Sequence, residues 1–165
     1  MVARSMSAPR DSTLLETSAA RLEVEVSIEA SPEQTWGALV GATDAWWPRE
    51  LRCVSSTSRM VLEPRAGGTL LEEDTDGGSL LWFQVIAVEP GRSLNLQGSL
   101  APPYGGPADT FLLLRVEEHG AGSQVHLTYS LHGHLDPATL PGTRQDWMML
   151  LEQGLKGYVE GAGRS

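Results

Sequence analysis

The sequence predicts an α+β domain in which one long C-terminal helix covers an antiparallel sheet of about seven strands. Three observations lead to this fold class. Apolar and polar residues alternate in most segments between residues 22 and 131, which is the period of half-buried strands. Glycines and prolines separate these segments, and no strand–helix–strand repeat occurs, so neighbouring strands should run antiparallel. The last segment, residues 143–160, carries apolar residues at helical spacing.

The N-terminal part contains one strand followed by two short helices. Residues 22–29 alternate strictly, with leucine, valine and isoleucine on one face and glutamate on the other. Ser31 can cap a helix, and Gln34 completes a capping box with it, so a helix should begin here and stop near Gly41. A second short helical piece, residues 43–47, is ended by the proline that follows.

The middle of the chain alternates between strands and turns. The Asp76-Gly77 dipeptide is a strong hairpin signal. The predicted strands are 59–63, 69–73, 80–88, 93–100, 110–116 and 124–131.

The turn at residues 90–91 determines which side chains point into the core. If these two residues alone form the turn, Val85 pairs with Leu96, and paired residues share a face of the sheet. Phe83 and Val85 then point inward and Trp82 points outward. A three-residue turn would reverse this assignment.

The final helix should present one apolar face to the sheet. Trp147, Leu151, Leu155 and Tyr158 recur at helical spacing, and the inward face of the sheet is the large surface they can cover.

Composition excludes several classes of function. The net charge is −9 and no basic cluster interrupts it, so nucleic acid is not an expected partner. No stretch approaches the roughly 18 apolar residues of a membrane span. Cys53 is the single cysteine, which rules out an intramolecular disulfide and is best interpreted as an idle thiol. Residues 1–19 are interpreted as a flexible arm on a cytoplasmic protein, and residues 20–165 as one domain.

Two polar sets resemble sites but have simpler explanations. Three histidines near the end of the last strand alternate with its apolar residues, which places them on the solvent side, and no metal site is expected there. They are His126, His132 and His134. Four carboxylates crowd one hairpin tip, where charges are usually just solvated. They are Glu72, Glu73, Asp74 and Asp76.

The predicted position of the Arg115 side chain depends on the strand register, and two positions are possible. In one register it shares the inner face with Phe111 and Leu113, where a charge must be paired and could anchor a ligand carboxylate. In the other, Leu112 and Leu114 face inward and Arg115 lies on the surface, which is the favoured reading.

Several local motifs, in order along residues 20–160, resemble one known superfamily. They are Trp46-Trp47-Pro48, the segment 63–68, Val88-Glu89-Pro90, and Trp147 with Leu151, Tyr158 and Glu160. The chain resembles the SRPBCC superfamily, which includes the birch-pollen allergen, START lipid-transfer domains and polyketide cyclases. Within it, the motifs are similar to bacterial relatives of the C-terminal domain of the activator of heat-shock-protein-90 ATPase. The resemblance implies a helix-grip fold, with a curved sheet around the helix and an apolar cavity between them.

The leading hypothesis is a non-catalytic protein that binds a small hydrophobic or aromatic molecule in a carrier, stress or self-resistance role, without a cofactor. An enzyme of the aromatase/cyclase type, and an interaction module with a protein partner or as a homodimer, are the alternatives. Several titratable groups in the cavity would favour the enzyme. The loop 101–109, with Tyr104, is the expected entrance, and Arg115 is a candidate polar anchor. The predicted cavity residues are Trp47, Met60, Leu62, Phe83, Val85, Leu94, Leu96, Leu127, Tyr129, Trp147, Leu151 and Tyr158.

Overall fold

The computed structural model describes residues 12–163. The predicted flexible arm, residues 1–19, therefore lies largely outside the described residues, although β1 already begins at Ser18, which pairs with Gly133. The elements, in chain order, are β1 (Ser18–Ile28), α1 (Pro32–Gly41), α2 (Thr43–Trp46), η1 (Arg49–Leu51), β2 (Arg59–Leu62), β3 (Thr69–Glu73), β4 (Ser79–Glu89), β5 (Ser93–Leu100), η2 (Pro102–Tyr104), β6 (Ala108–His119), β7 (Gly122–Gly133), η3 (Pro137–Thr139), α3 (Leu140–Met149), η4 (Leu150–Lys156) and α4 (Gly157–Ala162).

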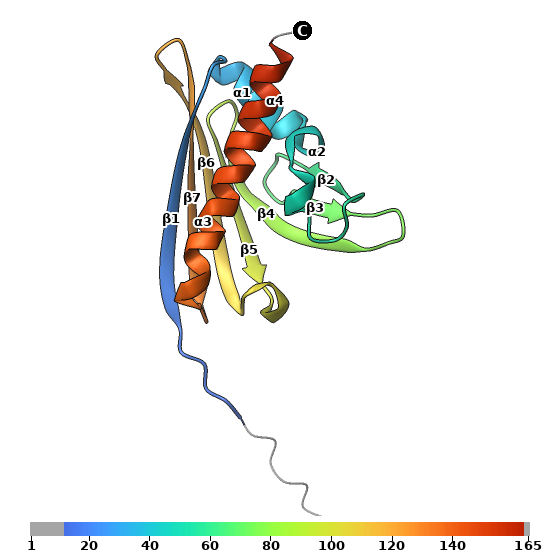
Figure 1. Cartoon of the computed structure of the whole chain (residues 1–165), viewed down its shortest axis with the longest axis vertical. Helices are drawn as coiled ribbons and strands as arrows, with labels where there is room; N and C mark the ends of the chain where they lie inside the picture. The colour runs from blue at the N-terminus through green and yellow to red at the C-terminus, as the bar shows by residue number, and fades with distance from the viewer. Residues whose placement is uncertain (1–11, 164–165) are drawn as a thin grey trace, which may run out of the picture.

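The strands form one seven-stranded antiparallel sheet in the order β1-β7-β6-β5-β4-β3-β2. The sheet curves around the helix formed by α3, η4 and α4, which runs along its concave face (Figure 1). β1 and β2 are the two edges, so the sheet is curved but not closed. The predicted α+β class, with two short helices and a long C-terminal helix, is confirmed.

The core lies between the concave face and the long helix, because strict alternation gives each strand one apolar side. Leu22, Val24, Val26 and Ile28 of β1 are all buried, as are Val125, Leu127, Tyr129 and Leu131 of β7. Helix α1 begins at the predicted capping box, in which Gln34 N–H donates to Ser31 Oγ at 3.2 Å and Ser31 N–H donates to Gln34 Oε1 at 3.1 Å.

The β4–β5 hairpin differs from the prediction in its turn but not in its inward face. Glu89 pairs with Ser93, so the turn has three residues rather than two. A bulge between Val85 and Ala87 adds one further residue on β4 and restores the pairing of Val85 with Leu96. The two one-residue differences cancel, and Val85 remains buried as predicted.

The prediction that Trp82 points outward is wrong. β3 and β4 are also irregular, because Leu70 pairs with Phe83 whereas Leu71 pairs with Leu81. Trp82 is the extra residue of this bulge, which frees it from strand alternation. Its ring packs edge-on against Trp47 with 5.2 Å between the centroids, on the inner side of the sheet.

The long helix contains a seven-residue π-helix, η4, and this changes which residues face the core. A π-helix has more residues per turn than an α-helix, so every residue after it is rotated relative to the α-helical pattern. As a result Val159 is buried, and Tyr158 is 38% exposed, contrary to the prediction that it faces the core. The helix also begins at Leu140, three residues before the predicted start at residue 143. Within residues 12–163, no helix has the length and apolar character needed to cross a membrane.

Gly154 allows the π-helix to approach α2 closely. A Cβ atom at this position would lie 2.6 Å from the carbonyl oxygen of Trp46 and 3.0 Å from Cδ of Pro48. The missing side chain therefore lets the middle of the helix pack on the segment that carries Trp47.

Candidate functional site

A cavity of about 350 Å³ lies between the first turns of the long helix and the sheet. β4, the end of β5, β6 and β7 form one side, α3 and the first residue of η4 form the opposite side, and the segment 47–53 and η2 border it. Its lining residues are Trp47, Glu50, Leu51, Arg52, Cys53, Leu80, Leu81, Trp82, Phe83, Ser99, Leu100, Tyr104, Thr110, Tyr129, Thr143, Asp146, Trp147 and Leu150.

Two groups of aromatic rings line this cavity. Tyr129 and Trp147 face each other across the sheet–helix boundary with 5.0 Å between their ring centroids, and Phe83 lies 6.3 Å from Trp147. Trp47 and Trp82 form the second group. Rings at these distances and tilts make favourable edge and offset contacts, so the walls are largely apolar.

One polar pair lies within the aromatic lining. Tyr129 is 4% exposed, and burial raises the pKa of its phenol to about 12, although a hydrogen bond with the Thr110 hydroxyl partly opposes this. The phenol therefore stays protonated at neutral pH, where it can donate a hydrogen bond but cannot act as a base. Thr110 is 1% exposed, so both hydroxyl groups belong to the interior.

The cavity mouth carries two carboxylates and a thiol. Glu50, Asp146 and Cys53 are exposed and all line the cavity. Partial burial, followed by the negative charges of Glu72 and Asp146, raises the pKa of the Cys53 thiol. Less thiolate forms at neutral pH as a result, so this cysteine is a poor nucleophile although solvent reaches it.

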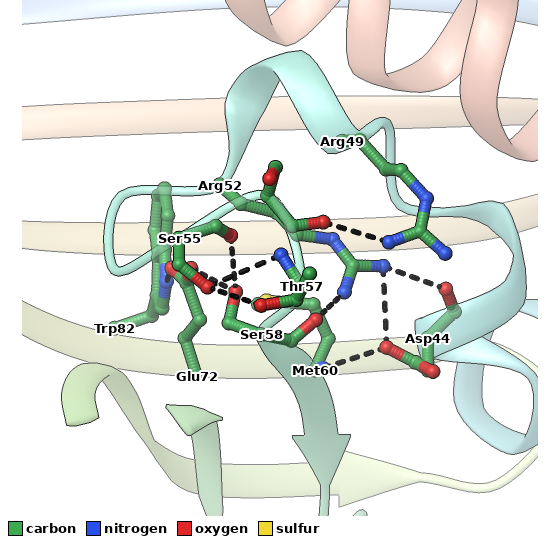
Figure 2. A network of polar contacts seen from close by, with 10 residues as sticks. Asp44, Arg49, Arg52, Ser55, Thr57, Ser58, Met60, Glu72 and Trp82 are labelled. Atoms are coloured by element: carbon green, nitrogen blue, oxygen red, sulfur yellow. Dashed lines mark hydrogen bonds and ion pairs between the residues drawn. The ribbon is translucent and has the colours of Figure 1, made fainter. Parts of the chain in front are cut away.

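A buried carboxylate holds the segment 51–58 against the sheet (Figure 2). Glu72 has no exposed surface and accepts hydrogen bonds from four groups. The donors are Cys53 N–H (2.9 Å), Val54 N–H (2.8 Å), Ser58 Oγ–H (2.5 Å) and Trp82 Nε1–H (3.0 Å). Burial alone would raise the pKa of Glu72, but these hydrogen bonds outweigh burial and lower it. The prediction that this carboxylate is simply solvated at a hairpin tip is wrong.

Arg52 forms the other half of this network (Figure 2). Its side chain is 3% exposed, lies 3.2 Å from the Asp44 carboxylate and donates to the backbone oxygens of Asp44 and Ser58. Asp44 also accepts from the backbone N–H of Met60 at 2.8 Å, which ties β2 to the same segment. Asp74 accepts from Ser55 and Thr57, so the neighbouring carboxylate is also structural.

The structure brings only part of the predicted site together. Trp47, Phe83, Tyr104, Tyr129 and Trp147 line the main cavity, and Tyr104 is 48% exposed at its edge. Leu62, Leu94, Leu96 and Leu151 instead surround a separate void of about 20 Å³, which is too small for a ligand. Met60, Val85 and Leu127 are core residues that line neither space, and Tyr158 lies in an open groove between α1 and α4.

Arg115 and His126 lie on the outer side of the sheet. Arg115 pairs with His126 in the strand register, its side chain is 51% exposed, and Glu117 lies 3.9 Å away. It therefore does not face the cavity, and the favoured outward reading is correct. His126 contacts Glu25 on the same outer face at 3.0 Å. Within residues 12–163, no cluster of histidine, cysteine and carboxylate groups could hold a metal ion.

Sequence reasoning interpreted Glu72 as solvated, and it missed Arg52, Thr110 and Asp146. Alternation could have found two of them, because Glu72 follows the buried Leu70 by two residues and Thr110 precedes the buried Leu112 by two. No sequence pattern indicates Arg52 or Asp146, because their positions depend on how an irregular segment and a helix end pack together.

The fold is shared with solved structures of low sequence identity, whereas no protein-family model and no curated protein matches the chain. An uncharacterised protein from Rhizobium leguminosarum is 19% identical, with a TM-score of 0.69 over 90% of this chain and 99% of that one. The allergen Ara h 8.0201 is 13% identical, with a TM-score of 0.66, and the match covers 87% of this chain and 99% of the allergen. The Aha1 protein from Colwellia psychrerythraea, solved as a dimer, is 21% identical. Its TM-score is 0.59, and the match covers 86% of this chain and 96% of that one.

At these identities the comparisons establish architecture, and they agree with the open curved sheet and the long C-terminal helix described above. The chain therefore has the helix-grip fold of the SRPBCC-type structures.

Proposed function

We propose that this protein binds a small, mostly apolar, ring-containing molecule in the cavity between Trp147 and the sheet. The observation that carries the proposal is the aromatic lining: six rings, those of Trp47, Trp82, Phe83, Tyr104, Tyr129 and Trp147, border one space of about 350 Å³. Small-molecule sites are typically concave, mainly apolar and about 300–1,000 Å³ in volume, with a few polar groups that orient the ligand. The cavity has this size and composition.

Binding of an uncharged fluorescent probe tests this proposal. We expect 1-aminoanthracene, a tricyclic amine, to bind with a dissociation constant in the micromolar range, equivalent to about −8 kcal/mol. Because three tryptophans, Trp47, Trp82 and Trp147, line the cavity, binding should also quench tryptophan emission. Native mass spectrometry of protein purified from its own source should then identify the natural ligand.

Two substitutions by tryptophan distinguish a residue that lines the cavity from one that lies in the packed core. Leu100 is half-buried and lines the cavity, so Leu100→Trp should fill space, preserve stability and abolish probe binding. Leu96 is 1% exposed beside the 20 Å³ void, so Leu96→Trp should overpack the core and cost about 1–3 kcal/mol. Unimpaired probe binding by Leu100→Trp would contradict the proposed site.

A catalytic function is the second candidate, because titratable groups line the cavity. Tyr129 could donate a hydrogen bond to a ketone oxygen, and Asp146 could accept a proton from the carbon beside a second ketone. In an intramolecular aldol condensation of a diketone, this would form one carbon–carbon bond and release water.

A soluble aromatic diketone substrate tests the enzyme hypothesis, with enone absorbance as the readout. A catalytic protein should lose turnover in both Asp146→Asn and Tyr129→Phe, which leave the shape of the cavity nearly unchanged. If turnover is no faster than in buffer, the enzyme hypothesis is wrong and only the binding function remains. The third hypothesis, a protein partner or a homodimer, stays a prediction.

A further inference from the structure

The mouth of the cavity carries two carboxylates that no positive charge balances. Glu50 on η1 and Asp146 on α3 both line the cavity, and both are exposed, so molecules in solution reach them. Neither side chain forms a hydrogen bond or an ion pair within residues 12–163. Other surface carboxylates of the protein do pair, as Glu73 does with Arg59 at 2.6 Å. The negative charge at the mouth is therefore uncompensated.

The thiol of Cys53 reports the sign of the electrostatic potential at the mouth. Cys53 follows Glu50 on the same segment and also lines the cavity, whereas Asp146 lies on the opposite side. Burial, the charge of Glu72 and the charge of Asp146, in that order, raise the pKa of this thiol. The Asp146 carboxylate therefore acts across the mouth on the segment that carries Glu50, and the potential there is negative.

The arginines of this region do not reverse that sign. Arg52 is the one cation among the described residues that line the cavity, and its charge is offset by Asp44 at 3.2 Å (Figure 2). Arg49 and Arg144, on the elements that carry the two carboxylates, do not line the cavity. A ligand anion would lose its hydration and approach two like charges, which is unfavourable, whereas a cation would meet complementary charge.

The aromatic lining makes these carboxylates more than an ordinary solvated acidic surface. They border the entrance to a space lined by six aromatic rings, which can receive the apolar part of a ligand. An ammonium group is also attracted to the face of an aromatic ring, because the ring carries negative charge density there. Tyr104, which is 48% exposed, places one such ring at the edge of the cavity.

We infer that the ligand is a ring compound with a protonated amine or another cationic group at its outer end, and that this group lies at the cavity mouth beside the Asp146 carboxylate. Glu50 adds to the attraction from the other side. This inference rests on the proposed function and specifies its ligand class. The rings supply affinity for the apolar part, and the carboxylates supply selectivity for positive charge.

Three naphthalene compounds of similar size test the inference at pH 7. 2-Naphthylmethylamine is positively charged, 2-naphthalenemethanol is neutral, and 2-naphthoate is negatively charged. Their dissociation constants are measured by displacement of 1-aminoanthracene, which is uncharged at this pH. Asp146→Asn removes one charge and nearly preserves the shape of the side chain. Glu152→Gln is the matched control, because Glu152 is an exposed carboxylate of the same long helix that does not line the cavity.

The measured quantity is the ratio of the alcohol to the amine dissociation constant, because changes in cavity volume affect both compounds alike. We expect a ratio of about five in the wild type and a fall of about threefold in Asp146→Asn, as for one exposed charge pair. The ratio should be close to one in the double variant Glu50→Gln, Asp146→Asn, and within about 1.5-fold of the wild-type value in Glu152→Gln. 2-Naphthoate should bind the wild type more weakly than the alcohol does.

Each alternative outcome has one meaning. If none of the three compounds binds the wild type, the proposed function itself fails. If the amine and the alcohol bind equally, or 2-naphthoate binds more tightly than both, the cationic class is wrong while the binding function stands. A wild-type ratio in Asp146→Asn would overturn the placement of the charge. An equal fall in Glu152→Gln would attribute the preference to the net charge of −9 and overturn the inference as well.

Salt dependence in the wild-type protein covers the case in which Asp146→Asn does not fold. Exposed charges are screened over about 10 Å in 0.1 M salt and about 3 Å in 1 M salt. The alcohol-to-amine ratio should therefore fall toward one as sodium chloride is added. A ratio that does not change with salt would contradict a charge contact at the mouth.

Discussion

Replacement of Glu72 by glutamine should destabilise the protein strongly, although it removes no volume from the core. In the folded protein, Oε1 accepts from Val54 and Ser58, and Oε2 accepts from Cys53 and Trp82. A glutamine retains one acceptor oxygen and turns an NH₂ group toward the other pair of donors. Two hydrogen bonds to a charged group are lost, each contributing about 1.5–3 kcal/mol, and partial relaxation should leave a net loss of about 3 kcal/mol.

Urea unfolding followed by circular dichroism measures this loss, and a thermal melt should show a fall of about 6–12 °C for a domain of this size. Glu73→Gln is the matched control, because Glu73 is the adjacent residue and pairs with Arg59 at the surface. A surface ion pair contributes about 0–1 kcal/mol, so the control should nearly match the wild type. Equal losses in the two variants would refute the structural role of the buried carboxylate.

The pH dependence gives an independent check. The folded-state pKa of Glu72 lies below its ordinary value of 4.5, so its contribution to stability is present above that value. As the pH falls through the folded-state pKa, this contribution is lost. The stability difference between wild type and Glu72→Gln should therefore shrink in acid. A constant difference from pH 7 to pH 3 would contradict the lowered pKa.

Two further predictions concern the long helix and the cavity mouth. Gly154→Ala should destabilise the protein, because the new Cβ would meet a backbone oxygen at 2.6 Å, whereas the nearest atom to a Cβ at Gly157 lies 3.9 Å away. Gly157→Ala should therefore stabilise it by up to about 1 kcal/mol, and urea unfolding of both variants checks the opposite signs. Cys53 should react with a disulfide reagent more slowly at pH 8 than free cysteine, because its thiol pKa is raised, and Asp146→Asn should speed the reaction by removing one cause. An unchanged rate in Asp146→Asn would show that the negative charge of Asp146 does not raise the pKa of the Cys53 thiol.

The fold could be predicted from the sequence because its elements depend on local patterns. Alternation in β1 and β7 places their apolar residues in the core, and the capping box at Ser31 marks the start of α1. It is harder to predict which residues of β4 face the core, because each of its two bulges shifts the following residues to the other face of the sheet. Neither bulge has a sequence signal of its own. The prediction that Val85 faces inward assumed a two-residue turn and no bulge. It is correct because the turn and the bulge each add one residue and their effects on the register cancel.

The site was less predictable because it is made by tertiary contacts. Glu72 belongs to an acidic segment, residues 72–76, that is typical of a solvated turn, yet the irregular segment 51–58 folds over it and supplies three donors. Arg52 is buried by the same segment. The aromatic residues were easier to identify, but strand alternation alone cannot separate those that line the cavity, such as Phe83, from those that fill the core.

The π-helical segment between α3 and α4 is equivalent to one residue inserted into a regular helix. A protein with the same architecture and an uninterrupted α-helix would reach the same position in space with one residue fewer. Sequence comparisons that assume a constant helical period would therefore align Tyr158 of this chain with buried residues elsewhere, when Val159 is the equivalent position. Relatives of this protein are best aligned with a one-residue gap within 150–156, and the last helical turn should then reveal which of them share the insertion.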